Sequence, residues 1–371
     1  MHLLRRCLVA EGAPMAGIDH EVRSTRLARM MDGVLVAQLI HVVAELGIAD
    51  LLRDQPMPVA QLARRTGTDP DALYRALRAL AGEGVFTESG PRTFGLTPLA
   101  EPLRTDAPDS VRNIARMRGG REHWLAWAEL QHSIRTGSSA FRHAHGTDLW
   151  TYLASHPDQA AVFDRAMGDD AQHIHAAAAS VLDLSDVSRL VDVGGGHGYL
   201  VARLLRRYPE LSAVVLDQPH TMQGAERVLA EAGVRDRCEL VAGDFLDSVP
   251  TGGDAYVLSR ILHDWDDQAC LRVLGNIRHA MAAAGQVIVV DSVVPEGDTQ
   301  HSAKLVDIIM LALNEGRERS EAELATLLEA ARLRHTATLD TSSHISVIIS
   351  DVQPGNIPTC TREVEHTGSG Q

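Results

Sequence analysis

The chain has 371 residues, which is long for one domain and suits two. Its formal net charge of −14 disfavours a nucleic acid or an anionic membrane as partner, because either would favour a basic face. We expect no apolar run long enough to span a bilayer, and four scattered cysteines without a C-x-x-C pattern are typical of a cytoplasmic protein. Residues 1–23 are not expected to hold a secretory signal, because the apolar stretch behind their arginines is short, and they are expected to be flexible, with Met1 and Met15 both open as the native start.

Residues 24–100 have the pattern of a winged helix-turn-helix. A helix opens at Asp69 and Pro70, and the segments 84–88 and 93–97 suggest a short hairpin. The first 100 residues hold 11 arginines, no lysine and 11 acidic residues, so this module has no net charge. A DNA reader would normally carry a basic recognition face, so dimerisation is the better interpretation.

Residues 101–180 are predicted to be all-helical and rich in aromatic side chains, which either form a core or line a pocket for a flat substrate. In residues 181–350, short β-rich runs alternate with helices, which predicts parallel strands joined by crossovers in an α/β, Rossmann-like, doubly wound sheet. The expected strands are 189–193, 213–216, 238–242, 255–258 and 287–290, with a late pair at 336–339 and 345–349. The polar residues 351–371 are expected to be disordered.

The most informative motif is a glycine-rich turn after the strand that ends at Asp192 and Val193. The dinucleotide-binding fingerprint G-x-G-x-x-G is not met, because Tyr199 stands where its third glycine should be. An acidic residue followed by G-x-G-x-G is the form used for S-adenosylmethionine (SAM). This pattern disfavours a nicotinamide oxidoreductase and favours a SAM site.

Polar groups also follow the next strands. Ligands of an open α/β sheet bind at the carboxyl ends of its strands, so these groups are expected to converge. Asp217, 19 residues past Gly198, can accept hydrogen bonds from both ribose hydroxyls, although it also fits a helix cap. The Asp244 carboxylate can accept a hydrogen bond from the adenine amino group, although an aspartate at this place is also typical of a turn. The predicted cofactor residues from this reasoning are Asp192, Gly194, Gly196, Asp217, Gly243, Asp244, Phe245, Ser259 and Arg260.

Five motifs occur in a fixed order: residues 191–198, 216–219, 243–245, 261–267 and 317–320. With them, residues 25 to 350 resemble the plant-type, metal-independent O-methyltransferases that include caffeic acid O-methyltransferases. The resemblance is to the bacterial branch that tailors aromatic polyketides and other natural products. It implies SAM as methyl donor, S-adenosylhomocysteine as product, a small aromatic acceptor and a homodimer formed through the N-terminal domain. It adds Gln218 and Trp265 to the cofactor residues, although Trp265 equally fits a core position.

A phenol is mostly protonated at neutral pH, so methylation of its oxygen needs a base. His263 follows the fourth strand, has a suitable ordinary pKa of about 6.5, and matches the family's base. Asp291 and Glu318 are expected to orient it. Two positions depart from the plant pattern: Asp291 replaces a glutamate, and Ser259 replaces a lysine that contacts the cofactor carboxylate.

By family position, the acceptor pocket uses Phe163, Met167, Asp264, Met310 and Asn314. Phe163 and Met167 also fit an ordinary core face one helical turn apart. The cluster of Asp264, Asp266 and Asp267 suggests Mg²⁺, but carboxylates at a helix N-terminus explain it better, so no metal is predicted.

The resulting prediction is a SAM-dependent O-methyltransferase acting on a phenolic or enolic hydroxyl of an aromatic natural product. One alternative is a SAM-binding enzyme of the same fold that acts as decarboxylase, hydroxylase or pericyclase. A winged-helix regulator is the other. The acceptor itself stays open.

Overall fold

The computed structural model describes residues 20–353 of the chain, which divides into two compact units, Met1–Gly120 and Arg121–Gln371. The two candidate start methionines and residues 354–371 of the expected disordered tail lie outside the described residues. Helix α1 (His20–Glu45) and strand β10 (Ser346–Val352) both extend into segments that were expected to lack regular structure. The first unit continues past the expected boundary at residue 100, because helix α5 (Arg112–Gly119) packs on α1.

The first unit is a winged helix. Helix α4 begins where the sequence predicts: the Asp69 carboxylate accepts hydrogen bonds from the N–H groups of Asp71 and Ala72, and Pro70 takes the first helical position. The predicted hairpin is confirmed as two strands of an antiparallel sheet with the order β1-β3-β2. The remaining bounds are α2 (Ile48–Leu51), β1 (Met57–Pro58), α3 (Val59–Thr66), α4 (Pro70–Gly82), β2 (Phe86–Gly90), β3 (Thr93–Leu96) and the 3-10 turn η1 (Glu101–Leu103).

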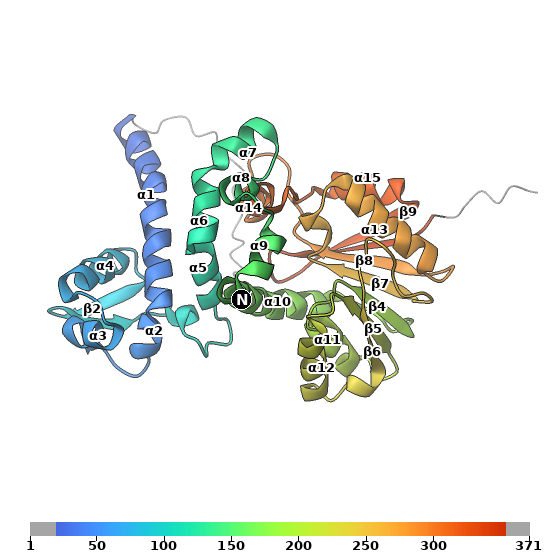
Figure 1. The fold of residues 1–371 in the computed structure, drawn as a ribbon, viewed down its shortest axis with the longest axis horizontal. Coiled ribbons are helices and arrows are strands. Elements are labelled where there is room, and N and C mark those ends of the chain that lie inside the picture. Colours follow the sequence, from blue (N-terminus) through green and yellow to red (C-terminus); the bar gives the residue numbers. More distant parts are fainter. Residues whose placement is uncertain (1–19, 354–371) are drawn as a thin grey trace, which may run out of the picture. The chain divides into compact units, whose positions relative to one another are not determined.

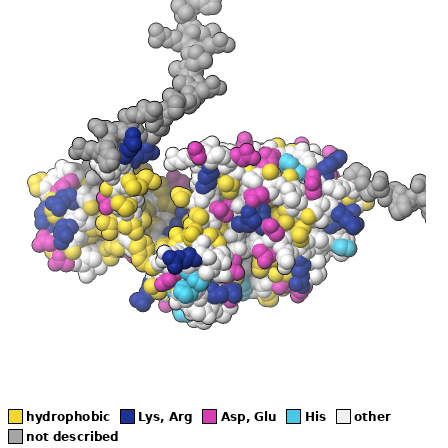
Figure 2. Space-filling view, turned by 90° about the horizontal axis from the view of Figure 1, so that it is seen from above, with side chains coloured by type: hydrophobic (Ala, Val, Ile, Leu, Met, Phe, Trp, Pro, Cys, Tyr) yellow, Lys and Arg dark blue, Asp and Glu magenta, His cyan; other side chains and the backbone are white. Residues whose placement is uncertain are grey.

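Helix α1 exposes an apolar face. Its largest exposed apolar side chains are between 40% and 69% exposed: Leu27, Met30, Met31, Val34, Leu35 and Val42. Figure 2 shows hydrophobic side chains gathered on this unit. Residues Arg23–Glu45 also pass a length and hydropathy test for a membrane span, with 11% of the tested window buried. The expectation that no run reaches that length is therefore wrong. Length and composition do not identify a span, because a helix face covered by a second protein has the same character.

The second unit begins with five helices, as expected for its aromatic-rich region. Phe141 is fully buried and its ring lies edge-on to Tyr152, with centroids 5.4 Å apart. Trp150 lies edge-on to Phe163 at 5.7 Å. The bounds are α6 (Arg121–Ala128), α7 (Leu130–Thr136), α8 (Ala140–His145), α9 (Leu149–Ser155) and α10 (Pro157–Val181).

A seven-stranded sheet with the order β6-β5-β4-β7-β8-β10-β9 follows, which confirms the predicted fold class. Strands β4 to β8 are parallel, and β9 and β10 pair antiparallel. Helices α10, α11 and α12 cover one face, and α13 and α15 cover the other (Figure 1). The strand bounds are β4 (Arg189–Val193), β5 (Ser212–Asp217), β6 (Cys238–Ala242), β7 (Ala255–Ser259), β8 (Gln286–Asp291) and β9 (Leu333–Asp340). The other bounds are α11 (Tyr199–Arg207), α12 (Met222–Glu231), η2 (Arg235–Arg237), η3 (Leu262–Asp264), α13 (Asp267–Ala280), α14 (Ala303–Asn314) and α15 (Glu321–Ala330).

The strand order reverses between β4 and β7. From β4 the chain moves outward to β5 and β6, and then returns to β7 on the other side of β4. Such a switch point opens a crevice at the carboxyl ends of the strands. The glycine turn leaves β4 at this edge, and Ser259 and Arg260 leave β7 there.

Candidate active site

The turn after β4 has the backbone of a ligand cradle. Gly194, Gly196 and Gly198 have left-handed φ angles of 73°, 55° and 72°, a conformation that favours glycine. A Cβ added at Gly194 would lie 2.4 Å from Ile261 Cδ1, whereas one added at Gly196 would meet no atom within 4 Å. Gly196 therefore faces open space at the carboxyl edge of the sheet.

Asp217 ties the end of β5 to this turn. Its Oδ2 accepts a hydrogen bond from the Gly196 N–H over 2.7 Å, and its Oδ1 accepts one from the Gln218 N–H over 2.6 Å. Gly243 N–H donates to the Asp217 carbonyl over 3.0 Å. The alternative of a cap for the next helix is wrong, because Thr221 occupies the N-cap of α12.

The next strand end contributes a turn and a ring. Asp244 Oδ1 accepts a hydrogen bond from the Leu246 N–H over 2.8 Å, so the carboxylate does form a local turn. A Cβ at Gly194 would lie 3.4 Å from Phe245 Cε1, which places the Phe245 ring beside the cradle. Trp265 lies edge-on to Phe245, with ring centroids 6.0 Å apart.

Asp192 is buried below the cradle, with 1% of its surface exposed. Burial raises the pKa of Asp192 to about 7, and repulsion from Asp217 adds to the rise. Its Oδ1 has no hydrogen-bond partner within residues 20–353. An orphaned buried oxygen and the open space at Gly196 together fit a polar ligand such as SAM.

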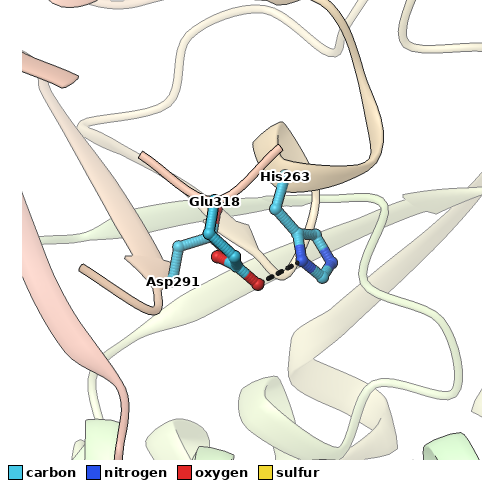
Figure 3. Close-up of side chains that lie close together, drawn as sticks. All are labelled: His263, Asp291 and Glu318. Atoms are coloured by element: carbon cyan, nitrogen blue, oxygen red, sulfur yellow. Dashed lines mark hydrogen bonds and ion pairs between the residues drawn. The ribbon is translucent and has the colours of Figure 1, made fainter. Parts of the chain in front are cut away.

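The predicted base and its two acids meet at the ends of β7 and β8 (Figure 3). His263 lies in turn η3, Asp291 ends β8, and Glu318 follows α14; all three are buried, and one ligand-type atom of each lies within 4.8 Å of the others. The His263 Nδ1–H donates to Glu318 Oε1 over 2.9 Å. This contact leaves Nε2 as the accepting nitrogen of the ring.

The charges around this trio set its protonation. Burial lowers the pKa of His263, as does the nearby Arg260, but the three carboxylates of Asp264, Asp291 and Glu318 outweigh both and raise it above 6.5. Burial raises the pKa of Glu318, but the hydrogen bond and charge of His263, with Arg260, outweigh this and lower it. Burial raises the pKa of Asp291 to about 7, and Glu318 adds to that rise. Glu318 is therefore the ionised partner of the imidazole.

Two residues expected at the cofactor have protein partners. Arg260 adopts a left-handed φ of 59°, and its Nη1 donates to Glu318 Oε1 over 3.2 Å. The structure thus joins Arg260 to the acid that holds the base, and its expected place in the cofactor site stays a prediction. Ser259 Oγ lies 3.1 Å from His175 Nε2 on helix α10.

The predicted acceptor residues are only partly brought together. Asn314 Nδ2 donates to Asp264 Oδ1 over 2.9 Å, and this oxygen lies 3.6 Å from His263 Nε2. Phe163 packs on a cluster that includes Leu313 of α14. Met310 is buried and Met167 is 38% exposed, so a common pocket wall for the three apolar side chains stays a prediction.

The acidic cluster is engaged by protein groups. Asp266 caps α13 by accepting a hydrogen bond from the Ala269 N–H over 2.8 Å. Asp267 Oδ1 pairs with Arg319 Nη2 over 2.7 Å, and Asp264 holds Asn314. These contacts support the helix-terminus interpretation over a Mg²⁺ site.

Sequence reasoning gave no role to two residues that border the site. His175 is 8% exposed and its Nδ1 has no partner in the described part of the chain; burial, with Arg203, lowers its pKa to about 4. A lone histidine in an alanine-rich helix carries no spacing signal. Arg319 directly follows Glu318, and that adjacency is the signal that could have found it.

Comparison with known proteins matches two family models. Residues 127–334 match the O-methyltransferase domain, and residues 28–106 match the O-methyltransferase dimerisation domain. Together the matches cover both units.

Several relatives span most of the chain. A phenazine O-methyltransferase of Lysobacter antibioticus is 42% identical over 325 residues, which are 88% of this chain and 95% of the relative. The 3-amino-4-hydroxybenzoate 4-O-methyltransferase of Streptomyces cremeus is 42% identical over 326 residues, or 86% and 88% of the two chains. The crystal structure of an O-methyltransferase from neocarzinostatin biosynthesis, in complex with SAM and 2-hydroxy-5-methyl naphthoic acid, has a TM-score of 0.75 at 34% identity. That match covers 85% of this chain and 96% of the other.

Proposed function

Because the chain belongs to the family of SAM-dependent O-methyltransferases, we propose that it methylates a phenolic or enolic hydroxyl of an aromatic natural product. The observation that carries this proposal is the hydrogen bond of 2.9 Å from His263 Nδ1 to Glu318 Oε1. Because this hydrogen bond uses Nδ1, the basic Nε2 of the His263 ring faces away from Glu318. Relatives named for a phenazine and an aminohydroxybenzoate support an aromatic acceptor.

The base is proposed to act as follows. His263 Nε2 takes the proton from the acceptor hydroxyl, whose O–H bond breaks and whose oxygen becomes the nucleophile. Nδ1–H stays bonded to Glu318, and the ionised carboxylate stabilises the imidazolium that forms. Arg260 keeps Glu318 ionised through its contact of 3.2 Å. Base catalysis of this kind contributes about 10² to 10⁴ in rate.

The cofactor is proposed to lie in the cradle at the switch point. When bound, SAM supplies the methyl group. A carboxylate offers about four acceptor positions, and Asp217 uses two of them on Gly196 and Gln218, which leaves two for ribose hydroxyls. The residues proposed to hold the cofactor are Asp192, Gly194, Gly196, Asp217, Gln218, Gly243, Asp244, Phe245, Ser259, Arg260 and Trp265.

We propose that the reaction needs no metal. His263, Asp291 and Glu318 are close enough to share a cation, but Glu318 Oε1 already contacts the His263 ring and the Arg260 guanidinium. A second positive charge there would be repelled. Activity that survives EDTA is expected; strict dependence on added Mg²⁺ would contradict this part.

The N-terminal unit is the family's dimerisation domain, and we propose a homodimer in which a second copy covers the apolar face of α1. A cytoplasmic location fits the buried Cys238 and Cys270, which form no disulfide.

The test is turnover with SAM and a panel of hydroxylated aromatics, with S-adenosylhomocysteine and methylated product measured together. Equal amounts of the two are expected. Product formed without S-adenosylhomocysteine would indicate the alternative of a same-fold enzyme that does not transfer methyl. His263→Gln is expected to bind S-adenosylhomocysteine but to lose at least about 10²-fold in kcat. Near-normal turnover of that variant on an unionised phenol would refute the proposed base.

A further inference from the structure

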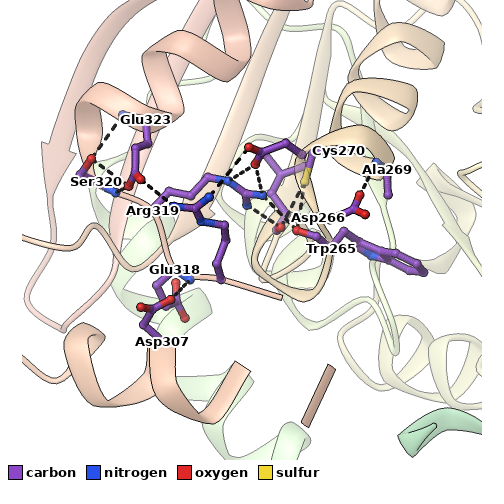
Figure 4. Close-up of polar contacts among 12 residues, drawn as sticks. Trp265, Asp266, Ala269, Cys270, Asp307, Glu318, Arg319, Ser320 and Glu323 are labelled. Carbon is purple, nitrogen blue, oxygen red and sulfur yellow. Dashed lines mark hydrogen bonds and ion pairs between the residues drawn. The ribbon is translucent and has the colours of Figure 1, made fainter. Parts of the chain in front are cut away.

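The buried guanidinium of Arg319 contacts the turn that carries the base (Figure 4). Arg319 is 3% exposed and directly follows Glu318. Its Nη1 donates to the Leu262 carbonyl over 2.8 Å, and its Nη2 donates to the Trp265 carbonyl over 3.0 Å. These two residues flank His263 and Asp264, so one side chain holds both ends of the catalytic segment.

The turn's own backbone satisfies these two carbonyls only in part. The Leu262 carbonyl accepts a hydrogen bond from the Trp265 N–H over 3.3 Å, and the carbonyls at the end of a helix otherwise lack partners within it. The Cys270 thiol also approaches them, at 3.2 Å from the Leu262 oxygen and 3.6 Å from the Trp265 oxygen. A charged guanidinium is the stronger donor, so Arg319 is the main contact that fixes this backbone.

Arg319 is itself anchored on two sides. Its Nε and Nη2 donate to Asp267 Oδ1 over 3.1 and 2.7 Å, at the first turn of α13. Its backbone forms a parallel bridge with Val293, and its carbonyl accepts a hydrogen bond from the Val294 N–H over 3.0 Å. Arg319 is therefore fixed to α13 through its guanidinium and to the segment after β8 through its backbone.

The residues just before Arg319 contact the same turn. The Arg317 N–H donates to the His263 carbonyl over 2.8 Å, and Glu318 accepts from the His263 ring. A Cβ at Gly316 would lie 2.2 Å from the His263 carbonyl oxygen, so the two backbones are closely packed. Residues 316–319 therefore contact the His263 ring, the His263 carbonyl, and the carbonyls of Leu262 and Trp265.

We infer that Arg319 is a positioning residue for the methyl transfer. It fixes the backbone of residues 262–265 so that the His263 ring meets Glu318 and the acceptor hydroxyl at once. A planar guanidinium reaches two carbonyls and a carboxylate together, whereas a lysine ammonium acts as a point charge and cannot span them. The inference rests on the proposed function, since it takes His263 as the base.

Arg319→Lys tests it, with Arg272→Lys as the matched control. The Arg272 side chain is 61% exposed and pairs with Asp247 over 3.2 Å. On a phenol that is protonated at the assay pH, Arg319→Lys is expected to lose about 10²-fold in kcat, because small misplacements of a catalytic group have effects of that size. The affinity of Arg319→Lys for S-adenosylhomocysteine is expected to stay unchanged, and Arg272→Lys is expected to match the wild type.

The distinguishing measurement uses a second phenol that is already ionised at the assay pH. No proton has to move there, so the loss in Arg319→Lys is expected to shrink to less than about tenfold. Asp267→Asn, which keeps Arg319 but removes its charged anchor, is expected to show the same pattern more weakly; it carries the test if Arg319→Lys does not fold. Equal losses on both phenols, or wild-type kcat in both variants, would overturn the inference. A wild-type protein that methylates neither phenol would instead count against the proposed function.

Discussion

Ser259 Oγ and His175 Nε2 lie 3.1 Å apart, and this hydrogen bond ties the carboxyl end of β7 to helix α10. The pKa of His175 is lowered to about 4 by burial and by Arg203, so the ring is neutral at neutral pH and donates from one nitrogen only. Ser259 is among the proposed cofactor residues. His175 therefore orients a hydroxyl at the place where the plant pattern has a lysine.

Replacing His175 by phenylalanine is expected to weaken S-adenosylhomocysteine binding by up to about tenfold, because a typical hydrogen bond contributes about 0.5–1.5 kcal/mol. His175→Gln, which keeps a polar group, is expected to recover most of the affinity. Calorimetric titration measures both. His279→Phe is the control, since His279 is exposed and, among residues 20–353, bonds only to the Gly275 carbonyl of its own helix. Wild-type affinity in His175→Phe would refute this role.

The pH dependence of methyl transfer follows from His263. Nε2 acts as a base only when the ring is neutral, and the surrounding carboxylates raise the pKa of His263 above 6.5. The rate is therefore expected to be low in acid and to increase as the pH rises through that raised pKa. Measured kcat from about pH 5.5 to about pH 9, with an acceptor that does not titrate in this range, should show a midpoint above 6.5.

Glu318→Gln is expected to move this midpoint to lower pH and to lower the plateau of kcat, because the imidazolium loses its charged partner. Asp247→Asn, which alters an exposed ion pair with Arg272, should leave the profile unchanged. A midpoint that does not move in Glu318→Gln would argue against Glu318 as the acid that sets the protonation of His263.

Two glycines with left-handed φ angles separate the effect of backbone strain from the effect of a position beside the cofactor. Gly196→Ala adds a methyl group in open space at a left-handed φ of 55°, which costs about 1–2 kcal/mol of stability. SAM affinity is expected to fall at least about tenfold, since the methyl group projects into the proposed cofactor site. Gly137→Ala places the same strain at the end of α7, at φ 75° with no atom within 4 Å, and should lower the melting temperature without changing SAM affinity. Equal SAM affinity in both variants would show that Gly196 does not face the cofactor.

The apolar face of α1 is expected to hold the dimer together. Met31→Glu with Leu35→Glu introduces two charges into a face whose side chains are each 63% exposed in the single chain, so light scattering should report a monomer. Leu99→Glu, at another position of the first unit that is also 63% exposed, should remain a dimer. A dimeric Met31→Glu, Leu35→Glu double variant would place the interface elsewhere.

Local sequence patterns were sufficient to predict the strands of the sheet. Strands 189–193 and 238–242 were predicted to the residue, because apolar β-rich runs end there at glycine or aspartate turns. Strand β9 begins three residues before the predicted 336, because a register shift at Ile349 and Ser350 lets its pairing with β10 continue. The trio around His263 was found through motif positions, and the structure adds which acid holds the ring.

Other features could not be found this way. His175 meets Ser259 across 84 residues and Arg319 meets Leu262 across 57, and neither separation leaves a periodic trace in the sequence. The apolar face of α1 was not predicted, because arginines and an aspartate interrupt the apolar residues in the first half of this helix. Such features depend on which elements the fold brings together.

His263 and Glu318 are separated by 55 positions, and the strand β8 lies between them. A growing polypeptide therefore cannot form this pair before residue 318 has left the ribosome, and by then β8 and α14 have already been synthesised.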